Sequence, residues 1–283
     1  MAVSSMKDIK LRIKSVESTM QITKAMEMVA SSKLRRAKER AEHARPYFNA
    51  LHETLHDIAY GNTDFSSPYV QMREIKKTCY VMIAGDRGLA GGYNTNVFKT
   101  VSAHMADKSV CVLPIGKKAV EYCLRHGYEM VSDAYVTAED VGIGDCFAVA
   151  QLLCNLYTER KFDALYMGYT NFVSMLSQQP AILKVLPIRY ERKQAKNSPE
   201  ALIMYEPSCE SVFNGIVPEY VGGLLYGALA ESVASELGAR RTAMDSASKN
   251  ANDMIEHLSL QYNRARQGSI TQEITEIVAG ASL

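Results

Sequence analysis

The stretch IKLRIKSVESTMQITKAMEMVASSKL, residues 9–34, carries the most regular apolar pattern in the chain. Its seam positions recur at alternating steps of four and three residues, and this spacing continues as far as Ile58. Such an alternation lays an apolar stripe along one face of a helix and is typical of a coiled coil. Thr23 and Glu27 are the polar interruptions, and Pro46 is expected to kink or loosen the helix. Residues 1–60 therefore predict an N-terminal coiled-coil helix.

Residues 209–283 repeat this pattern and predict a second, longer helix. Its seam positions are Ala230, Val233, Leu237, Arg240, Met244, Ala247, Ala251, Met254, Leu258, Gln261 and Ala265. Arg240 and Gln261 are the two polar residues that interrupt this apolar seam. Polar residues at a seam can mark partner contacts or fix the register, or their side chains can reach out to water. The pattern alone leaves these alternatives open.

The two helices are expected to pair with each other. A helix of this length gains most of its stability from packing, and its nearest partner is the other end of the same chain. We therefore predict a long antiparallel coiled coil in which the C-terminal helix overhangs. The overhang is rich in apolar residues, namely Ile270, Ile274, Ile277, Val278, Ala281 and Leu283. An exposed apolar end of this kind predicts a partner that encloses it.

The middle of the chain, residues 75–195, has a different character. Short apolar runs at 79–83, 110–115, 164–169 and 181–186 alternate with helical patterns such as 117–125 and 147–160. This alternation predicts a central α/β domain with a largely parallel sheet. Residues 191–208 are polar and are expected to link this domain to the last helix.

Composition narrows the function classes. The chain has 283 residues with 47% hydrophobic and 22% charged residues, which are ordinary values for a folded protein. No apolar run is long enough for a membrane span, and we expect neither a signal peptide nor a transit peptide at the N-terminus. The formal net charge of +1 gives no reason to expect nucleic acid as a partner.

One metal-binding motif occurs in the N-terminal helix. His52, Glu53 and His56 form HExxH, which in zinc proteases supplies two ligands and a general base. Ala59 and Asn62 stand where the extended signature has Gly and His, and no third ligand is evident. A zinc metallopeptidase remains an alternative that a bound-metal assay would test, but we expect no metal site.

Two glycine-containing stretches follow predicted strands. The first, at Gly116, lacks the Gly and the Ser or Thr of a Walker A loop, because Cys111 and Lys118 stand there. The second, GDRGLAGG at 85–92, matches no dinucleotide fingerprint. We interpret it as a structural turn between strand and helix, with a phosphate cradle as the alternative.

A basic run covers residues 33–40, KLRRAKER, with five basic residues and one acid. It indicates either a solvated face of the coiled coil or a surface that docks on an acidic partner. A coiled-coil nucleic-acid binder is a third hypothesis, which predicts steeply salt-dependent binding. We identify no catalytic constellation and no cofactor site in the chain.

Four blocks of the sequence carry a likeness to a known family. They are ITKAMEMVA at 22–30, ARPY at 44–47, DRGLAGG at 86–92 and ITQEITEIVAGA at 270–281. In this order they resemble the γ subunit of F-type ATP synthase, and the C-terminal block is the most specific. The likeness extends over both ends and the middle of the chain.

The resemblance implies a role in a rotary machine. The family's γ chain is the central rotor shaft, one copy per complex, inside a hexamer of three α and three β subunits. It also binds the ε subunit and the ring of c subunits, and it couples proton-driven rotation to the conformational cycle of the catalytic β subunits. It has no active site, cofactor or metal of its own. This likeness implies a bacterial chain on the cytoplasmic side of the cell inner membrane, peripheral to it.

The resemblance also implies roles for particular residues. The positions that match family contacts with the β subunit are Met26, Arg240, Arg266, Gln267, Thr271 and Glu273. Glu206 matches a position near the c ring. The chain ends one residue earlier than the family's common ending. This affects only the last contact between the C-terminal tip and the apolar bearing that holds it inside the hexamer. It also lacks the cysteine-bearing insertion of photosynthetic members, so we expect no thiol switch.

Overall fold

The structure is a computed structural model that describes residues 6–61, 66–106, 108–134, 137–188 and 205–281. The polar segment 191–208, predicted to be a linker, lies mostly outside these residues. The chain forms two compact units, one of residues 1–32 and 240–283 and the other of residues 33–239. Helices α1 (Met6–Gly61) and α5 (Cys209–Ala281) contribute to both units.

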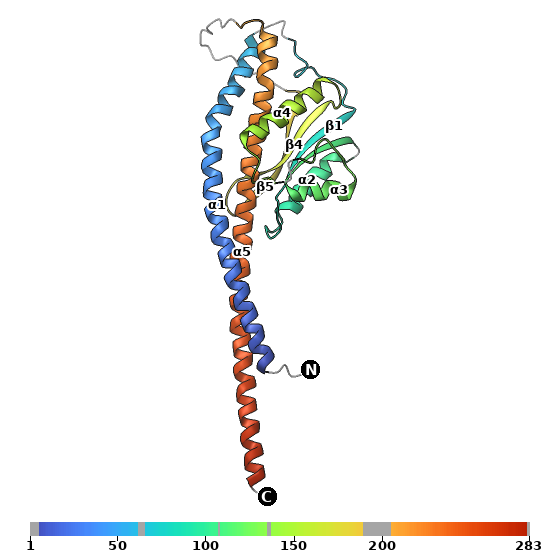
Figure 1. The fold of residues 1–283 in the computed structure, drawn as a ribbon. Coiled ribbons are helices and arrows are strands. Elements are labelled where there is room, and N and C mark those ends of the chain that lie inside the picture. The colour runs from blue at the N-terminus through green and yellow to red at the C-terminus, as the bar shows by residue number, and fades with distance from the viewer. Residues whose placement is uncertain (1–5, 62–65, 107, 135–136, 189–204, 282–283) are drawn as a thin grey trace. The chain divides into compact units, whose positions relative to one another are not determined.

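Helices α1 and α5 lie side by side and antiparallel in each unit (Figure 1). Both continue through a proline, Pro46 in α1 and Pro218 in α5. In the larger unit, Leu55 and Ile58 of α1 are buried in one cluster with Phe213 and Val217 of α5. The predicted pairing of the N- and C-terminal helices is confirmed.

The larger unit contains a five-stranded sheet in the order β3-β2-β1-β4-β5. The strands are β1 (Lys77–Ile83), β2 (Ser109–Ile115), β3 (Glu129–Met130), β4 (Ala164–Phe172) and β5 (Gln178–Leu186). Neighbouring strands pair in parallel from β3 to β4, whereas β5 is antiparallel to β4. This confirms the largely parallel sheet, and its strands include all four apolar runs named from the sequence.

Helices cover both faces of the sheet. Helices α2 (Tyr93–Met105) and α3 (Lys117–His126) pack on the face to which Tyr80 and Met82 point. Helix α4 (Ile143–Thr158) packs with α5 and the end of α1 on the face of Val81 and Ile83. Because both faces are buried, strands β1 and β2 at the centre of the sheet carry continuous rather than alternating apolar runs. Helix α2 follows the stretch 85–92, where the turn between strand and helix was predicted, whereas the two-residue strand β3 was not predicted from the sequence.

Among the described residues, no helix combines the length and the apolar character needed to cross a membrane.

Candidate functional site

The coiled coil of the smaller unit has a defined antiparallel register. The Thr23 hydroxyl lies 2.7 Å from that of Ser248, and Glu27 pairs with Arg241 at 4.0 Å. The two polar interruptions predicted in the N-terminal seam thus find polar partners on the opposite helix. Thr23 also donates to the Met20 carbonyl, so the Ser248 hydroxyl is the donor in their contact. The seam is closed around these pairs by buried apolar residues such as Ala30 and Met244.

The residues predicted to contact the β subunit all lie in this smaller unit. Arg240 is 8% exposed in the seam, and Met26 is half-buried beside Glu27. The other four, Arg266, Gln267, Thr271 and Glu273, are exposed along α5. Thr271 donates from its hydroxyl to the Gln267 carbonyl at 2.9 Å, which holds its side chain along the helix. Glu206, assigned to the c ring, is in the larger unit, exposed just before α5 begins.

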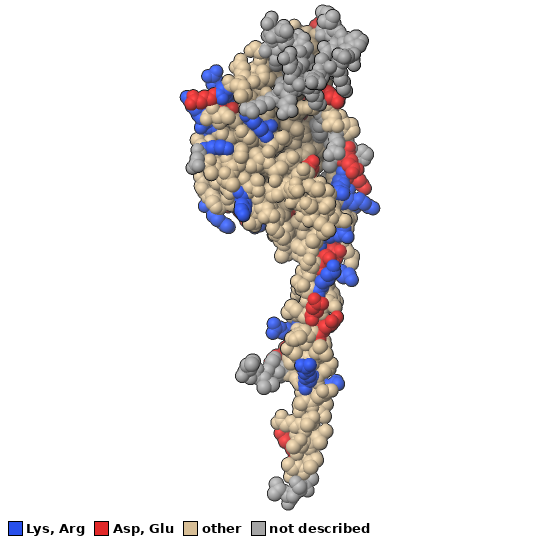
Figure 2. All heavy atoms as spheres, turned by 180° about the vertical axis from the view of Figure 1, so that it is seen from behind, with Lys and Arg blue, Asp and Glu red and all other residues tan. Residues whose placement is uncertain are grey.

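The C-terminal part of α5 carries large apolar side chains on its surface. Ile274 and Ile277 are 56% and 70% exposed, and Ile270 and Val278 are exposed as well. Helix α5 runs past the start of α1 here, so α1 provides no cover (Figure 1). Figure 2 shows that most of the surface near this end belongs to neither acidic nor basic residues. The predicted apolar overhang is therefore present, although Ala281 and Leu283 lie outside the residues whose side chains are described.

Helix α1 carries further exposed apolar residues, which were not predicted from the sequence as a surface for a partner. Leu11, Ile22, Met28 and Val29 are all more than half exposed on the coiled coil. The signal was the density of apolar residues in the block at 22–30, which fills more than one helix face. A second surface of the coiled coil is thus suited to a protein partner.

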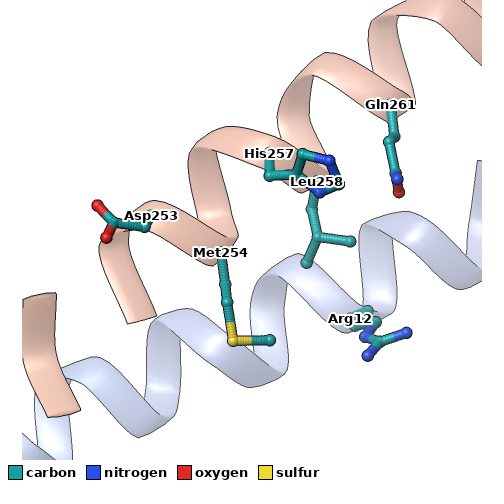
Figure 3. A pocket seen from close by; sticks show the side chains of 6 residues that line it. All are labelled: Arg12, Asp253, Met254, His257, Leu258 and Gln261. Carbon is teal, nitrogen blue, oxygen red and sulfur yellow. The ribbon is translucent and has the colours of Figure 1, made fainter. Parts of the chain in front are cut away.

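A shallow groove lies between the two helices of the same unit (Figure 3). Met254 and Leu258 of α5 point toward α1 and form its apolar part, and Gln261 points the same way. Arg12 of α1 lines it too, together with the polar side chains of Asp253 and His257. Gln261, noted as a polar interruption of the seam, therefore lines a groove between the helices.

The glycine-containing stretch 85–92 is a turn that connects β1 to α2. Its Asp86 carboxylate accepts hydrogen bonds from the backbone N–H of Lys117, at the start of α3, and from that of Ala138, at 3.1 and 2.9 Å. The carboxylate therefore occupies the N-terminus of α3, and the Asn94 side chain of α2 accepts from the Gly85 N–H at 2.8 Å, so polar groups of the turn are paired within the chain. This geometry favours the predicted structural turn over a phosphate cradle.

The same stretch is packed tightly against α5. Glu236, 2% exposed, comes so close to Gly85 that a Cβ there would lie 2.6 Å from its carboxyl carbon. Tyr93 is buried beside them, and burial together with the nearby Glu236 raises the pKa of its hydroxyl. Ser232 accepts from the Thr170 N–H at 3.1 Å, which ties α5 to β4. This buried polar cluster fixes the α/β domain to the long helix.

The HExxH motif lies on α1, and the structure describes only some of its side chains. The His52 ring stacks on Tyr220 at 5.7 Å, and its Nδ1 lies 3.3 Å from the Tyr220 hydroxyl. Leu55, inside the motif, is buried between the helices, and the His56 side chain lies outside the described residues. No group of three potential ligands gathers in the part of the chain that the structure describes.

The seam, the exposed apolar end and the attached α/β domain define a coiled-coil stalk protein, whose functional surface is a helix pair. A family model described as ATP synthase matches residues 5–282. The ATP synthase gamma chain of Ruminococcus albus is 46% identical over 286 residues, covering 99% of each chain. The chain therefore belongs to the ATP synthase gamma-chain family.

Further relatives agree with this assignment. The sodium ion specific ATP synthase gamma chain of Acetobacterium woodii is 42% identical, covering 98% of each chain. A chain in the solved OSCP/F1/c-ring of Euglena gracilis mitochondrial ATP synthase shares the fold with a TM-score of 0.66. It is 18% identical and covers 98% of this chain and 93% of that chain. The zinc metallopeptidase alternative finds no support among these proteins.

Proposed function

We propose that this chain is the central rotor shaft of an F-type ATP synthase. In this role it couples the proton-driven rotation of a c ring to the conformational cycling of three catalytic β subunits. Its sequence similarity to ATP synthase gamma chains, which extends over the whole chain, carries the proposal. The exposed apolar end of α5 supports it, because an enclosing hexamer of α and β subunits would cover that surface.

The mechanism uses the asymmetry of the coiled coil. A shaft that presents different side chains on different faces makes different contacts with each surrounding subunit. It thereby biases each β site toward a different conformation in turn. We assign the β contacts to Met26, Arg240 and the exposed residues at 266–273 of α5, named above. Segments 1–60 and 209–283 form the shaft, and segment 75–195 with Glu206 lies toward the ε subunit and the c ring.

The cellular setting follows from the same proposal. One copy of the chain serves each complex of three α and three β subunits. The chain is held peripherally at the cytoplasmic side of the cell inner membrane through the c ring. Nucleotide chemistry takes place on the α and β subunits, and nucleic acid is not a partner.

Assembly with α and β subunits tests the proposal. The purified chain is mixed with α and β subunits from the same cells, and subunit ratio and ATP hydrolysis are measured. We expect one copy per three α and three β, and a changed hydrolysis rate with Arg266→Ala. Arg125→Ala, an exposed arginine of α3, is the control and should leave the rate unchanged. Failure to form a complex with competent α and β subunits would refute the shaft function.

A further inference from the structure

Two buried cysteines lie side by side on neighbouring strands of the sheet. Cys79 of β1 is the register partner of Cys111 of β2 in a parallel pair. Both belong to the buried cluster on the sheet face that α4 and α5 cover. Neighbouring strands run about 4.8 Å apart, and the Cα atoms of disulfide-bonded cysteines are about 4.4–6.8 Å apart. The sheet therefore holds the two residues at a separation that a disulfide bond can span.

The two thiols contact each other directly and differ in acidity. A hydrogen bond joins them, with Cys79 as the donor and the Cys111 sulfur as the acceptor. This bond raises the pKa of Cys79, and burial raises it further. The same bond lowers the pKa of Cys111, and the positive charge of Lys77 also lowers it. The thiolate is the reactive form of cysteine, so Cys111 is suited to attack first and Cys79 to resolve the product.

A lysine at the start of β1 places a positive charge beside the pair. Lys77 precedes Cys79 by two residues and therefore lies on the same face of the strand. Its ammonium also contacts both carboxylate oxygens of Glu129, at 2.8 and 2.7 Å, and Glu129 is the register partner of Cys111 on β3. The charge of Lys77 favours a thiolate at the pair, whereas that of Glu129 opposes it.

Access to the pair is from the Lys77 end. The Lys77 side chain is 30% exposed, Cys111 retains 4% of its surface, and Cys79 is completely covered. A small reagent that enters beside Lys77 therefore meets Cys111 before Cys79. This order of access agrees with the order of acidity of the two thiols.

The other buried cysteines of the domain have less reactive environments. Burial raises the pKa of Cys123 to about 11 and the pKa values of Cys146 and Cys154 to about 12. Across the described ranges of the chain, no three Cys, His, Asp or Glu side chains gather in a set suited to a metal ion. The paired thiols themselves are thus the reactive unit.

We propose that Cys79 and Cys111 form a reversible disulfide when hydrogen peroxide reaches the α/β domain. The Cys111 thiolate attacks one peroxide oxygen, the O–O bond breaks, and the other oxygen leaves as hydroxide and takes up a proton to become water. The Cys79 sulfur then attacks the sulfenic sulfur of Cys111 and displaces the second hydroxide, which takes the Cys79 proton and also leaves as water. The two thiols lose two electrons in total, and one hydrogen peroxide is reduced to two water molecules.

This modification site is separate from the shaft surfaces. No residue assigned above to the β subunit or the c ring belongs to it, and it does not require assembly with other subunits. The prediction of no thiol switch rested on the missing cysteine-bearing insertion, whereas this pair lies in the strands of the sheet.

Peptide mapping of the purified full chain tests the proposal. The folded chain is treated with hydrogen peroxide, the remaining thiols are alkylated in denaturant, and the chain is digested with trypsin without reductant. Cys79 and Cys111 then lie in separate peptides, 78–87 and 109–117, each of which contains one cysteine. We expect a disulfide that joins these two peptides and that dithiothreitol cleaves, while the other buried cysteines are alkylated.

An internal control fixes the dose of peroxide. Met72 is 69% exposed, so its oxidation in the same digest shows that the dose was sufficient. If Met72 is oxidised while Cys79 and Cys111 remain free, or while each is oxidised without a bond between them, the proposal is overturned.

Single-cysteine variants test the order of the two steps. Cys79→Ala leaves Cys111 without a resolving thiol, so its sulfenic acid should persist and react with dimedone. Cys111→Ala removes the first nucleophile, so Cys79 should remain free for alkylation. Cys123→Ala changes another buried cysteine of the domain and should leave the yield of disulfide unchanged. Dimedone labelling of Cys79 in place of Cys111 would overturn the assigned order. Near-ultraviolet circular dichroism verifies that each variant is folded, and the mapping of the parent chain decides the proposal without them.

Two charge variants of one ion pair test the role of Lys77. Lys77→Gln should slow disulfide formation about tenfold, because a rise of one unit in the pKa of Cys111 leaves about one tenth of its thiolate. Glu129→Gln removes the opposing charge from the same ion pair and should not slow the reaction. Equal slowing in both variants would overturn the charge effect and assign the change to the loss of the ion pair.

Discussion

Gly116→Ala should lower the free energy of unfolding of the α/β domain more than an alanine substitution at any other glycine near the turn at 85–92. Gly116 connects β2 to α3 with φ of 96°. A Cβ at this position would lie 2.0 Å from the Ala84 carbonyl oxygen and 2.9 Å from its carbonyl carbon. Both atoms belong to backbone directly after β1, so no side-chain rotation relieves the clash.

The magnitude follows from what must move. Separating the two segments breaks the hydrogen bond from the Ala84 N–H to the Ile115 carbonyl, at 2.9 Å. It also breaks the bond from the Lys118 N–H to the Gly85 carbonyl, at 3.0 Å. Each loss costs about 1–2 kcal/mol, and a positive φ adds about 1–2 kcal/mol for alanine. The free energy of unfolding of the domain should fall by about 3–6 kcal/mol.

Gly127→Ala provides the matched control. Gly127 has a φ of 67°, and nothing lies within 4 Å of its added Cβ, so only the backbone strain of about 1–2 kcal/mol remains. Urea unfolding is followed by near-ultraviolet circular dichroism, which reports the buried Tyr80 and Tyr157 of this domain. The reasoning is refuted if Gly116→Ala costs no more than Gly127→Ala.

Two further predictions concern the seam and the pH dependence. Thr23→Val removes the acceptor of the Ser248 hydroxyl and should cost about 1 kcal/mol, whereas adding Ser248→Ala should recover most of it. Thermal melts of the parent, the two single variants and the double variant measure this cycle, and additive losses would contradict a direct contact. Burial lowers the pKa of His104 below its ordinary 6.5, and the positive charge of Lys108 lowers it further. The unfolded chain therefore binds more protons below that pH, so domain stability is full above pH 6.5 and falls as the pH drops through it. Urea midpoints at pH 7.5 and 5.5 should differ less in His104→Gln than in the parent, and an equal difference would assign the effect to other groups.

The sequence alone determined the long helices, the apolar strands and the family. A seam spacing of four and three is a local property of the helix, and so residues 9–58 and 230–265 reveal which face is buried before any fold is known. The short apolar runs that alternate with helical patterns likewise indicated the strands of a largely parallel sheet. The partner contacts proposed at 266–273 rest on family likeness alone, because nothing in their spacing distinguishes a partner contact from a solvated face.

Which distant residues contact each other depends on the tertiary structure. Thr23 and Ser248 are separated by 225 positions, and a shift of one helical turn in register would pair other residues. Asp86 became the cap of α3 only because β1 and β2 are neighbours in the sheet. The end of strand β4 shows the same dependence, since Gly238 packs against the Phe172 ring and Lys38 lies over it, from two helices far away in sequence. Local periodicity fixes the elements, but contacts between elements depend on their mutual placement, which spacing along the chain does not encode.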